Sequence, residues 1–224
     1  MLDGPAPFAD RAQSLADVSR LNAMFGGRAI TLAQVKRLLA GAPRDRAITV
    51  LDVGTGGADI PRALARWSRR ARRRLRIFAL DRDPATLAVA RHRTAGYPEI
   101  VLLQGDALAL PVQPASIDLV ISALTLHHLD PTAAVRYLAE MDAAGRRGLV
   151  VNDLTRSRPA YAAVWLATRV LTRNRMSRHD GPMSVLRAYT PDEVSALCEK
   201  AGLFDVRVVR YRSLARQVAV RAKR

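Results

Sequence analysis

The sequence predicts an α/β fold, and three observations support this prediction. Short β-branched apolar runs alternate with segments of helical periodicity along most of the chain. A glycine cluster separates the first of these runs from the helix that follows it. Acidic residues stand where the next two runs end, which is the edge at which open α/β sheets bind ligands. A length of 224 residues suits one such domain.

The first predicted strand and the turn after it organise the rest of the chain. Ile48–Val53 is apolar and β-branched, which indicates a strand buried on both faces. The glycines of Gly54–Gly57 follow, and a helix opens at Asp59 with Pro61 in its first turn. This layout brings backbone N–H groups and a helix N-terminus against a ligand. A dinucleotide fingerprint would require glycine at Asp59, and the phosphate motif G-x-x-x-x-G-K-[ST] is absent.

The second strand, Leu75–Asp81, ends in a carboxylate. An acid at this position can accept hydrogen bonds from both ribose hydroxyls of a nucleoside, and Asp81 follows the glycine turn at about the expected ~20 residues. Asp81 could instead cap the helix Pro84–His92, although Asp83 is also placed to do so.

Polar residues also follow the third and fourth strands. Gly105–Ala107 comes directly after the third strand, Glu99–Gln104. The fourth strand begins at Asp118, and His127 and His128 stand just past its end. Imidazole, with an ordinary pKa of about 6.5, can take a proton from a hydroxyl or phenol, but either ring could equally pack or cap.

The remainder predicts one more strand, an insertion and a closing strand pair. Helix Pro131–Met141 leads to a fifth strand, Gly148–Leu154, which ends in Asn152-Asp153. An apolar helix over Pro159–Leu171 is followed by the polar stretch Arg173–Asp180 and a turn at Gly181-Pro182. The last elements are a helix, Pro191–Ala201, and strands Phe204–Tyr211 and Leu214–Val220 joined by Arg212-Ser213. Before the first strand we expect a loose terminus, Met1–Pro7, and helices Asp10–Leu21 and Thr31–Leu39 around a glycine elbow, Phe25–Gly27.

The pattern Asp52-x-Gly54-x-Gly56-Gly57 resembles motif I of the class I S-adenosylmethionine (SAM) methyltransferases, with Ala58 where the last glycine usually stands. The resemblance covers residues ~45–220 and is strongest to small-molecule enzymes of the ubiquinone/menaquinone type. It implies a Rossmann-like, seven-stranded, mostly parallel sheet with a terminal antiparallel hairpin. It also implies an N-terminal helical cap (1–45), a SAM-binding domain (46–224) and a helical insertion after the fifth strand (155–189) that forms a substrate lid.

The resemblance further implies roles for individual residues. Gly54 and Gly56 would hold the methionine part of SAM, Asp81 the ribose, and Asp106 and Ala107 the adenine. The full expected cofactor set is Asp52, Gly54, Thr55, Gly56, Asp81, Arg82, Asp106, Ala107 and Ala123. The candidate bases are His127, His128 and His179, and the candidate acceptor contacts are Phe25, Asp153, Trp165 and Arg187. Arg20, Asn22, Asp180, Ser184 and Tyr189 are further candidates for the pocket.

Composition narrows the functional classes. The formal charge is +16, but only three of the 36 basic residues are lysines, and an arginine and alanine skew arises in GC-rich coding without selection for binding. The densest run, Arg66–Arg76, ends the helix after the glycine turn, where cations are favourable. Cys198 stands alone, so neither a disulfide frame nor a metal site is expected. No apolar run approaches the ~18 residues of a membrane span, and we expect a cytoplasmic protein.

Three functions remain open at this point. The first is methylation of a small apolar or aromatic acceptor, phenolic, polyketide or quinone-like, in secondary metabolism; the apolar helix then serves as lid or as homodimer interface. The second is an rRNA or tRNA methyltransferase that uses the arginine run. Against it, Ser122–Thr125 stands where many enzymes that methylate nucleic-acid amino groups carry N/D-P-P-Y/F. The third is a SAM-binding regulator without turnover.

Overall fold

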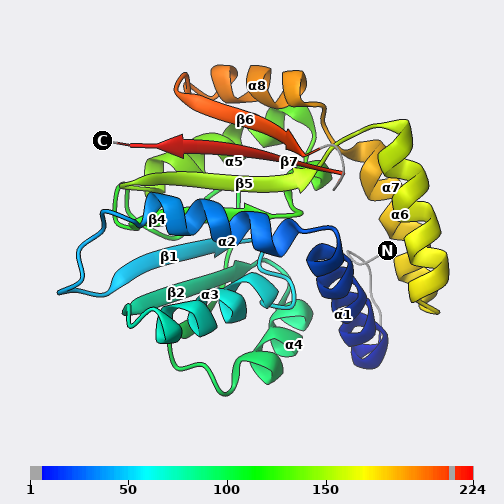
Figure 1. Cartoon of the computed structure of the whole chain (residues 1–224), viewed down its shortest axis with the longest axis horizontal. Coiled ribbons are helices and arrows are strands. Elements are labelled where there is room, and N and C mark those ends of the chain that lie inside the picture. Colours follow the sequence, from blue (N-terminus) through cyan, green and yellow to red (C-terminus); the bar gives the residue numbers. More distant parts are fainter. Residues whose placement is uncertain (1–6, 212–214, 224) are drawn as a thin grey trace.

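A computed structural model describes residues 7–211 and 215–223, so nearly all of the predicted loose terminus and the Arg212-Ser213 link lie outside the described residues. Within the described part, the chain forms a seven-stranded sheet with helices on both faces (Figure 1). The predicted α/β, Rossmann-like architecture is confirmed.

The sheet has the order β3-β2-β1-β4-β5-β7-β6. Strands β1 to β5 are mutually parallel, whereas β7 is antiparallel to both of its neighbours, as the predicted terminal hairpin requires. Because parallel strands end at the same edge, the segments after β1, β2, β3 and β4 meet there. The strands are β1 (Ile48–Val53), β2 (Leu75–Asp81), β3 (Ile100–Gln104), β4 (Leu119–Ala123), β5 (Gly148–Leu154), β6 (Val206–Tyr211) and β7 (Arg216–Ala222).

Side-chain hydrogen bonds fix where several helices begin. Asp83, Asp130, Ser157 and Asn174 accept from backbone N–H groups in the first turns of α4, α5, α6 and α7, and Thr190 forms a capping box on α8. The helices are α1 (Phe8–Met24), α2 (Gly27–Leu38), α3 (Asp59–Arg70), α4 (Pro84–Thr94), α5 (Pro131–Ala144), α6 (Arg158–Leu171), α7 (Arg175–Arg187) and α8 (Pro191–Lys200), with a 3₁₀ turn η1 at Leu126–His128.

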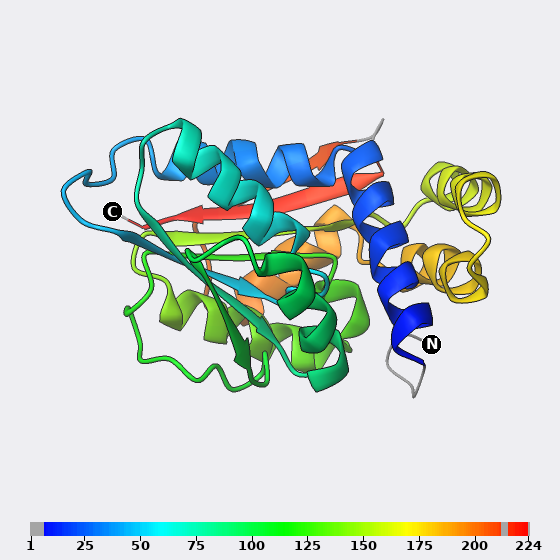
Figure 2. The same ribbon diagram turned by 90° about the horizontal axis from the view of Figure 1, so that it is seen from below.

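Both faces of the sheet are covered by a hydrophobic core. Ile48 and Val50 of β1 pack with residues of α2 and α3, while Leu51 and Val53 pack with residues of α5 and α8. Figure 2 shows the sheet between these two layers. All four side chains are buried, which explains why β1 is apolar at successive positions rather than at alternate ones.

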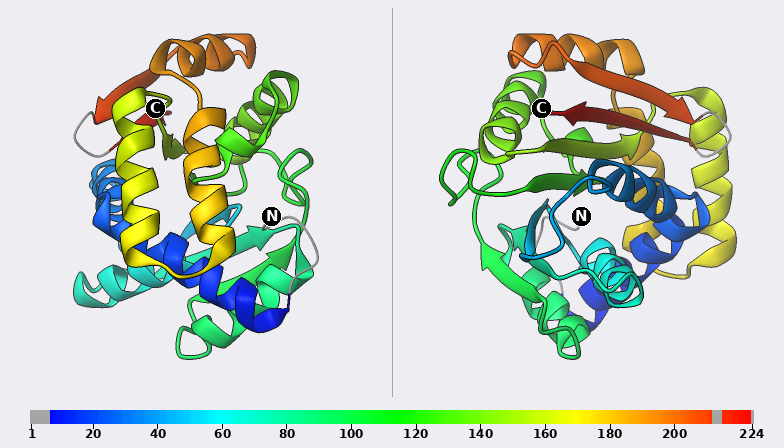
Figure 3. Two further views of the ribbon diagram at one scale, coloured as in Figure 1. Left: turned by 90° about the vertical axis from the view of Figure 1, so that its right-hand side faces the viewer. Right: turned by 60° about the vertical axis from the view of Figure 1, so that its left-hand side comes forward.

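Three helices lie beyond the edge where the parallel strands end. Helices α6 and α7 run side by side as a hairpin, and α1 lies against them (Figures 1 and 3). Buried Asp17 links α1 to the α6–α7 hairpin, because it accepts hydrogen bonds from the hydroxyls of Thr172 and Ser177. Of the two predicted N-terminal helices, only α1 lies over this edge, since α2 packs along the face of the sheet.

The turn predicted at Gly181-Pro182 is wrong. Helix α7 runs through both residues, with buried Pro182 inside it. A Cβ on Gly181 would lie 2.7 Å from a methyl carbon of Thr168, so glycine allows α7 to approach α6 closely. Packing between the two helices therefore overrides a local pattern that usually marks a turn.

Candidate functional site

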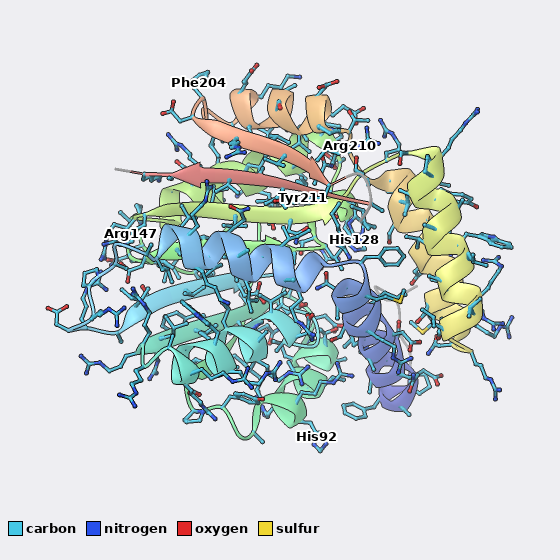
Figure 4. All side chains as sticks on the ribbon, in the orientation of Figure 1. His92, His128, Arg147, Phe204, Arg210 and Tyr211 are labelled. Carbon is cyan, nitrogen blue, oxygen red and sulfur yellow. The ribbon has the colours of Figure 1, made fainter. Side chains whose placement is uncertain are left out.

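A cavity of about 430 Å³ lies between the ends of the parallel strands and the helices α1 and α7. In Figure 4, His128 marks this end of the sheet, and Arg147 lies at the opposite end. A volume in the range ~300–1000 Å³ is typical of a small-molecule site. The cavity wall includes the glycine turn, the segments after β2, β3 and β4, and one side chain from β7.

The glycine turn has the backbone that its sequence predicts. Gly54 and Gly56 adopt φ values of +75° and +52°, and the N–H groups of Gly54 and Thr55 both donate to Leu80 O at 2.9 Å. A Cβ on Gly54 would overlap Thr125, whereas one on Gly56 would meet only Leu15 at 3.5 Å. Ala58, at the N-cap of α3, also has a left-handed backbone (φ +54°), which explains why glycine would suit this position.

Asp52 supplies a buried carboxylate directly beneath this turn. Its Oδ2 accepts a hydrogen bond from Thr55 Oγ1 at 2.7 Å, and both residues line the cavity. Burial raises the pKa of Asp52 to about 7, against the opposing effect of the Thr55 hydrogen bond. A cationic group entering the cavity would favour the ionised form.

Asp81 faces the cavity, and a different residue caps the next helix. Asp83 accepts from Ala85 N at 3.0 Å and so caps α4, the role that the sequence left open between the two acids. Asp81 Oδ2 accepts from Gly56 N at 2.9 Å, and its Oδ1 accepts from Asp83 N at 3.1 Å. A carboxylate oxygen can accept two hydrogen bonds, so both oxygens retain capacity toward the cavity. Burial raises the pKa of Asp81.

The remaining expected cofactor residues complete one side of the cavity. Arg82, Asp106, Ala107 and Ala123 all line it. Asp106 is exposed, and its Oδ1 accepts from Leu108 N at 2.8 Å, which closes the turn after β3. The second carboxylate oxygen of Asp106 accepts no hydrogen bond from the residues that the structure describes.

His127 and Asp153 form a buried pair across the ends of β4 and β5. His127 Nδ1 lies 2.6 Å from Asp153 Oδ1, and the His127 N–H donates to Asp153 Oδ2 at 3.0 Å. Burial acts to raise the pKa of Asp153, but its interactions with His127 and Leu154 N lower it overall. An ionised Asp153 requires the proton of a neutral His127 to be on Nδ1, which makes Nε2 an acceptor. His127 lines the cavity, whereas Asp153 lies behind it.

The other two candidate bases, His128 and His179, are more exposed. The His128 ring lies against that of His127, with 4.2 Å between centroids. His179 of α7 hydrogen-bonds its neighbour, with 3.0 Å between His179 Nδ1 and Asp180 Oδ1, although adjacent residues seldom make such contacts. All three histidines line the same cavity, so the structure brings the three candidate bases together.

The comparisons with known proteins agree with this geometry. Residues 50–148 match a family model described as a methyltransferase domain. The chain is also 30% identical over 168 residues to the 2-phytyl-1,4-naphtoquinone methyltransferase of Thermosynechococcus vestitus, with 71% of this chain and 73% of that protein aligned. The chain belongs to the class I SAM-dependent methyltransferases.

A second relative agrees with this assignment, and a solved structure shares the fold. An uncharacterized methyltransferase of Mycobacterium tuberculosis is 35% identical over 104 residues, which span 46% of this chain and 39% of that protein. The crystal structure of a SAM-dependent methyltransferase from Aquifex aeolicus superposes with a TM-score of 0.57 at 19% identity, over 83% of this chain and 87% of the other. The cofactor is therefore SAM, and the protein is an enzyme.

The residues present fit this cofactor. SAM combines a nucleoside with a sulfonium and a zwitterionic amino-acid end, and it requires hydroxyl acceptors, anionic surroundings and a partner for a carboxylate. The methyltransferase cavity offers the carboxylates of Asp52, Asp59 and Asp81, and the guanidinium of Arg216. Arg216 is buried, and its Nε and Nη1 have no hydrogen-bond partner in the part of the chain that the structure describes.

Some expected acceptor contacts reach the methyltransferase cavity and others do not. Phe25, Arg187 and Ser184 line it, as do Asn22 and Asp180. Trp165 does not: it is 40% exposed on the outer side of α6, where Arg169 stacks on its ring. Arg20 also points away and donates to Leu171 O, and Tyr189 donates to Leu129 O. Trp165 lies outside the cavity because of its position around helix α6, where Val164, one residue earlier, faces inward.

Sequence reasoning did not single out Arg216. A signal was nevertheless present, because Arg216 shares a strand face with the buried residues Val218 and Val220. An arginine on the apolar face of a strand indicates a specific partner.

Other expectations concern regions outside the cavity. The arginine run lies at the opposite edge of the sheet, where Arg69 pairs with Glu99 and Arg73 donates to carbonyl oxygens of Ala40 and Ala42. Among the described residues, no group of three or more His, Cys, Asp or Glu side chains could hold a metal ion, and no helix is long and apolar enough to cross a membrane. Leu166 and Val170 leave an apolar strip exposed on α6, where a dimer interface stays a prediction.

Proposed function

We propose that this methyltransferase acts on a small apolar or aromatic acceptor with an ionisable hydroxyl, of phenolic, polyketide or quinone-like character, in secondary metabolism. The observation that carries this proposal is the His127–Asp153 pair, whose imidazole lines a cavity that also has apolar walls. The name of the Thermosynechococcus vestitus relative specifies a naphthoquinone, an aromatic compound whose reduced, hydroquinone form carries ionisable hydroxyls.

For cofactor binding we assign the roles that the cavity geometry favours. Gly54 and Gly56 would hold the methionine part, Asp81 would accept hydrogen bonds from the ribose hydroxyls, and Asp106 and Ala107 would hold the adenine. Bound SAM supplies an electrophilic methyl group on a sulfonium. The protein contributes alignment of the acceptor oxygen with that methyl group, which is the largest source of acceleration in such a displacement.

His127 acts as the general base in this proposal. The carboxylate of Asp153 accepts a hydrogen bond from His127 Nδ1–H and so keeps that proton on Nδ1. The lone pair of His127 Nε2 is then available to take a proton from an acceptor hydroxyl. The imidazolium that forms is stabilised by the carboxylate already in contact with it. Both side chains are only 3% exposed, so water competes little for the pair.

Phe25, Leu154 and Val164 form the apolar wall against which the acceptor packs, and Val164 belongs to the proposed lid segment 155–189. Arg187 lies at the same side of the cavity and is exposed, so it can contact a polar substituent of the acceptor. Helix α1 and the α6–α7 hairpin cover part of this space, which limits the access of water to the reacting groups.

The proposal is tested by incubating the enzyme with methyl-labelled SAM and separate pools of phenols, naphthohydroquinones and bulk RNA, followed by mass spectrometry. We expect label on hydroxyl-bearing aromatic compounds, insensitive to RNase, and a loss of at least a hundredfold in His127→Ala. His92→Ala is the matched control, because His92 is exposed on α4, away from the cavity (Figure 4). Label confined to RNA, or full activity of His127→Ala, would contradict the proposal.

A further inference from the structure

Arg216 is a buried cation with an incomplete set of partners. Its side chain projects from the first residue of β7, opposite Leu154 of β5, and it is 2% exposed. Nε and Nη1 lack hydrogen-bond partners among the described residues, although guanidinium groups carry five donors. An unpaired charge in a protein interior is strongly unfavourable, so such a group indicates a partner supplied from outside the chain.

The neighbouring acids do not fill this role. Asp59 and Asp153 act on Arg216 electrostatically, but neither forms an ion pair with it within 4.0 Å in the described structure. Asp153 is engaged by His127, and Asp59 accepts from Asn22 Nδ2 at 3.2 Å. Burial lowers the pKa of Arg216 to about 10, which still leaves the guanidinium charged at neutral pH.

A second polar group without a complete set of hydrogen bonds, the side-chain amide of Asn22, lies beside the guanidinium. Asn22 Oδ1 is buried and has no partner among the described residues. A Cβ on Gly27 would lie 3.0 Å from Arg216 Cζ and would overlap Asn22 Oδ1, so glycine at this position keeps both groups close together. Gly27 is also the first residue of the 12-residue helix α2, whose amino end favours negative charge.

The unpaired donors of Arg216 and the unpaired acceptor oxygen of Asn22 therefore lie at the same wall of the cavity. A carboxylate would satisfy Arg216 alone, whereas an α-amino acid group would satisfy both sides. Its ammonium could donate to Asn22 Oδ1 and interact with Asp59, which lies at the start of α3 next to the glycine turn. The amino-acid end of SAM has this chemistry.

We propose that Arg216 is the receptor for a carboxylate that enters the cavity, with the amino-acid end of SAM as the favoured source and an acceptor carboxylate as the other. Binding of the amino-acid end of SAM depends only on the SAM site. Binding of an acceptor carboxylate depends also on the acceptor class proposed above. In either case the bidentate geometry of a guanidinium explains the use of arginine.

The test compares two ligands that share a nucleoside but differ at this end. Calorimetry measures the affinities of adenosylhomocysteine, which carries the amino-acid group, and of 5′-methylthioadenosine, which lacks it. We expect Arg216→Met to weaken adenosylhomocysteine binding at least tenfold and to change methylthioadenosine binding less than twofold. Arg216→Lys keeps the charge and is expected to restore part of the loss.

Controls separate this effect from damage to the fold. Methionine replaces an unpaired buried charge with an apolar side chain of similar length, so the ligand-free variant should melt at or above the wild-type temperature. Arg221→Met is the matched control on the same strand, because Arg221 pairs with Asp142 far from the cavity. This variant should bind both nucleosides like the wild type.

The second arm uses the enzyme saturated with adenosylhomocysteine and the pair 2-naphthoate and 2-naphthol. If Arg216→Met leaves adenosylhomocysteine affinity unchanged but loses naphthoate binding selectively, the carboxylate belongs to the acceptor. Unchanged affinity for both adenosylhomocysteine and naphthoate would overturn the inference. Neither arm requires methyl transfer, so failure of the proposed reaction would be seen separately, in the labelling experiment.

Discussion

Replacement of Asp81 by alanine should weaken binding of adenosylhomocysteine by about 30- to 1000-fold. Gly56 N and Asp83 N each donate to a different oxygen of Asp81, so each oxygen can accept one further hydrogen bond from a ribose hydroxyl. Hydrogen bonds to a charged group contribute roughly 1.5–3 kcal/mol each. With part of this offset by desolvation of the hydroxyls, about 2–4 kcal/mol remains, and every ~1.4 kcal/mol is tenfold in affinity.

Isothermal titration calorimetry measures this loss directly. The 2′,3′-dideoxy analogue of adenosylhomocysteine is the matched ligand, because it lacks the two hydroxyls and should bind wild type and Asp81→Ala nearly equally. Thermal melting without ligand checks that the glycine turn survives loss of its hydrogen bond from Gly56 to Asp81. An affinity for adenosylhomocysteine within twofold of wild type would refute the ribose assignment.

Three other predictions follow from the same geometry. Asp153→Asn should lower the methyl-transfer rate constant roughly 100- to 1000-fold, because the carboxylate stabilises the imidazolium of His127. An opposite charge ~4 Å away contributes about 4 kcal/mol at an effective dielectric constant of ~20. Single-turnover rates near wild type would exclude this role. The raised pKa of Asp52, about 7 against roughly 3.9 when unfolded, favours folding below pH ~4, and that contribution is lost as the pH rises through 7. Urea denaturation between pH 5 and 8 should therefore show a stability that falls by roughly 2–3 kcal/mol and levels off above pH ~7, and Asp52→Asn should remove this fall. Parallel curves for the two proteins would contradict the assignment. Trp165→Ala should change neither cofactor nor acceptor affinity by more than about twofold, since its ring lies outside the cavity; a larger loss would place the acceptor elsewhere.

Much of this fold could be predicted because its signals are local. The apolar residues of β1 indicate burial on both faces, and two of the glycines after it, Gly54 and Gly56, adopt positive φ. Asp83 and Thr190 mark helix starts through hydrogen bonds within a few residues. The order of the carboxylates along the chain then places Asp81 at the cavity, because parallel strands end at one edge.

The features that could not be predicted depend on contacts between distant segments. His127 and Asp153 are 26 residues apart and meet only because β4 and β5 are adjacent in the sheet. The burial of Arg216 follows from the insertion of β7 between β5 and β6, next to α2. Helix α7 continues through Gly181 because the hairpin with α6 requires close packing there. Local periodicity carries no information about any of these contacts.

A crystal structure of the protein with adenosylhomocysteine would show directly whether Asp81 binds the ribose. We predict that the ribose hydroxyls lie within hydrogen-bond distance of both oxygens of Asp81, with the homocysteine sulfur beside the turn Gly54–Gly56 and the adenine against Ala107. A nucleoside bound elsewhere, or crystals soaked at saturating concentration that show no ligand between α1 and the strand ends, would contradict this account.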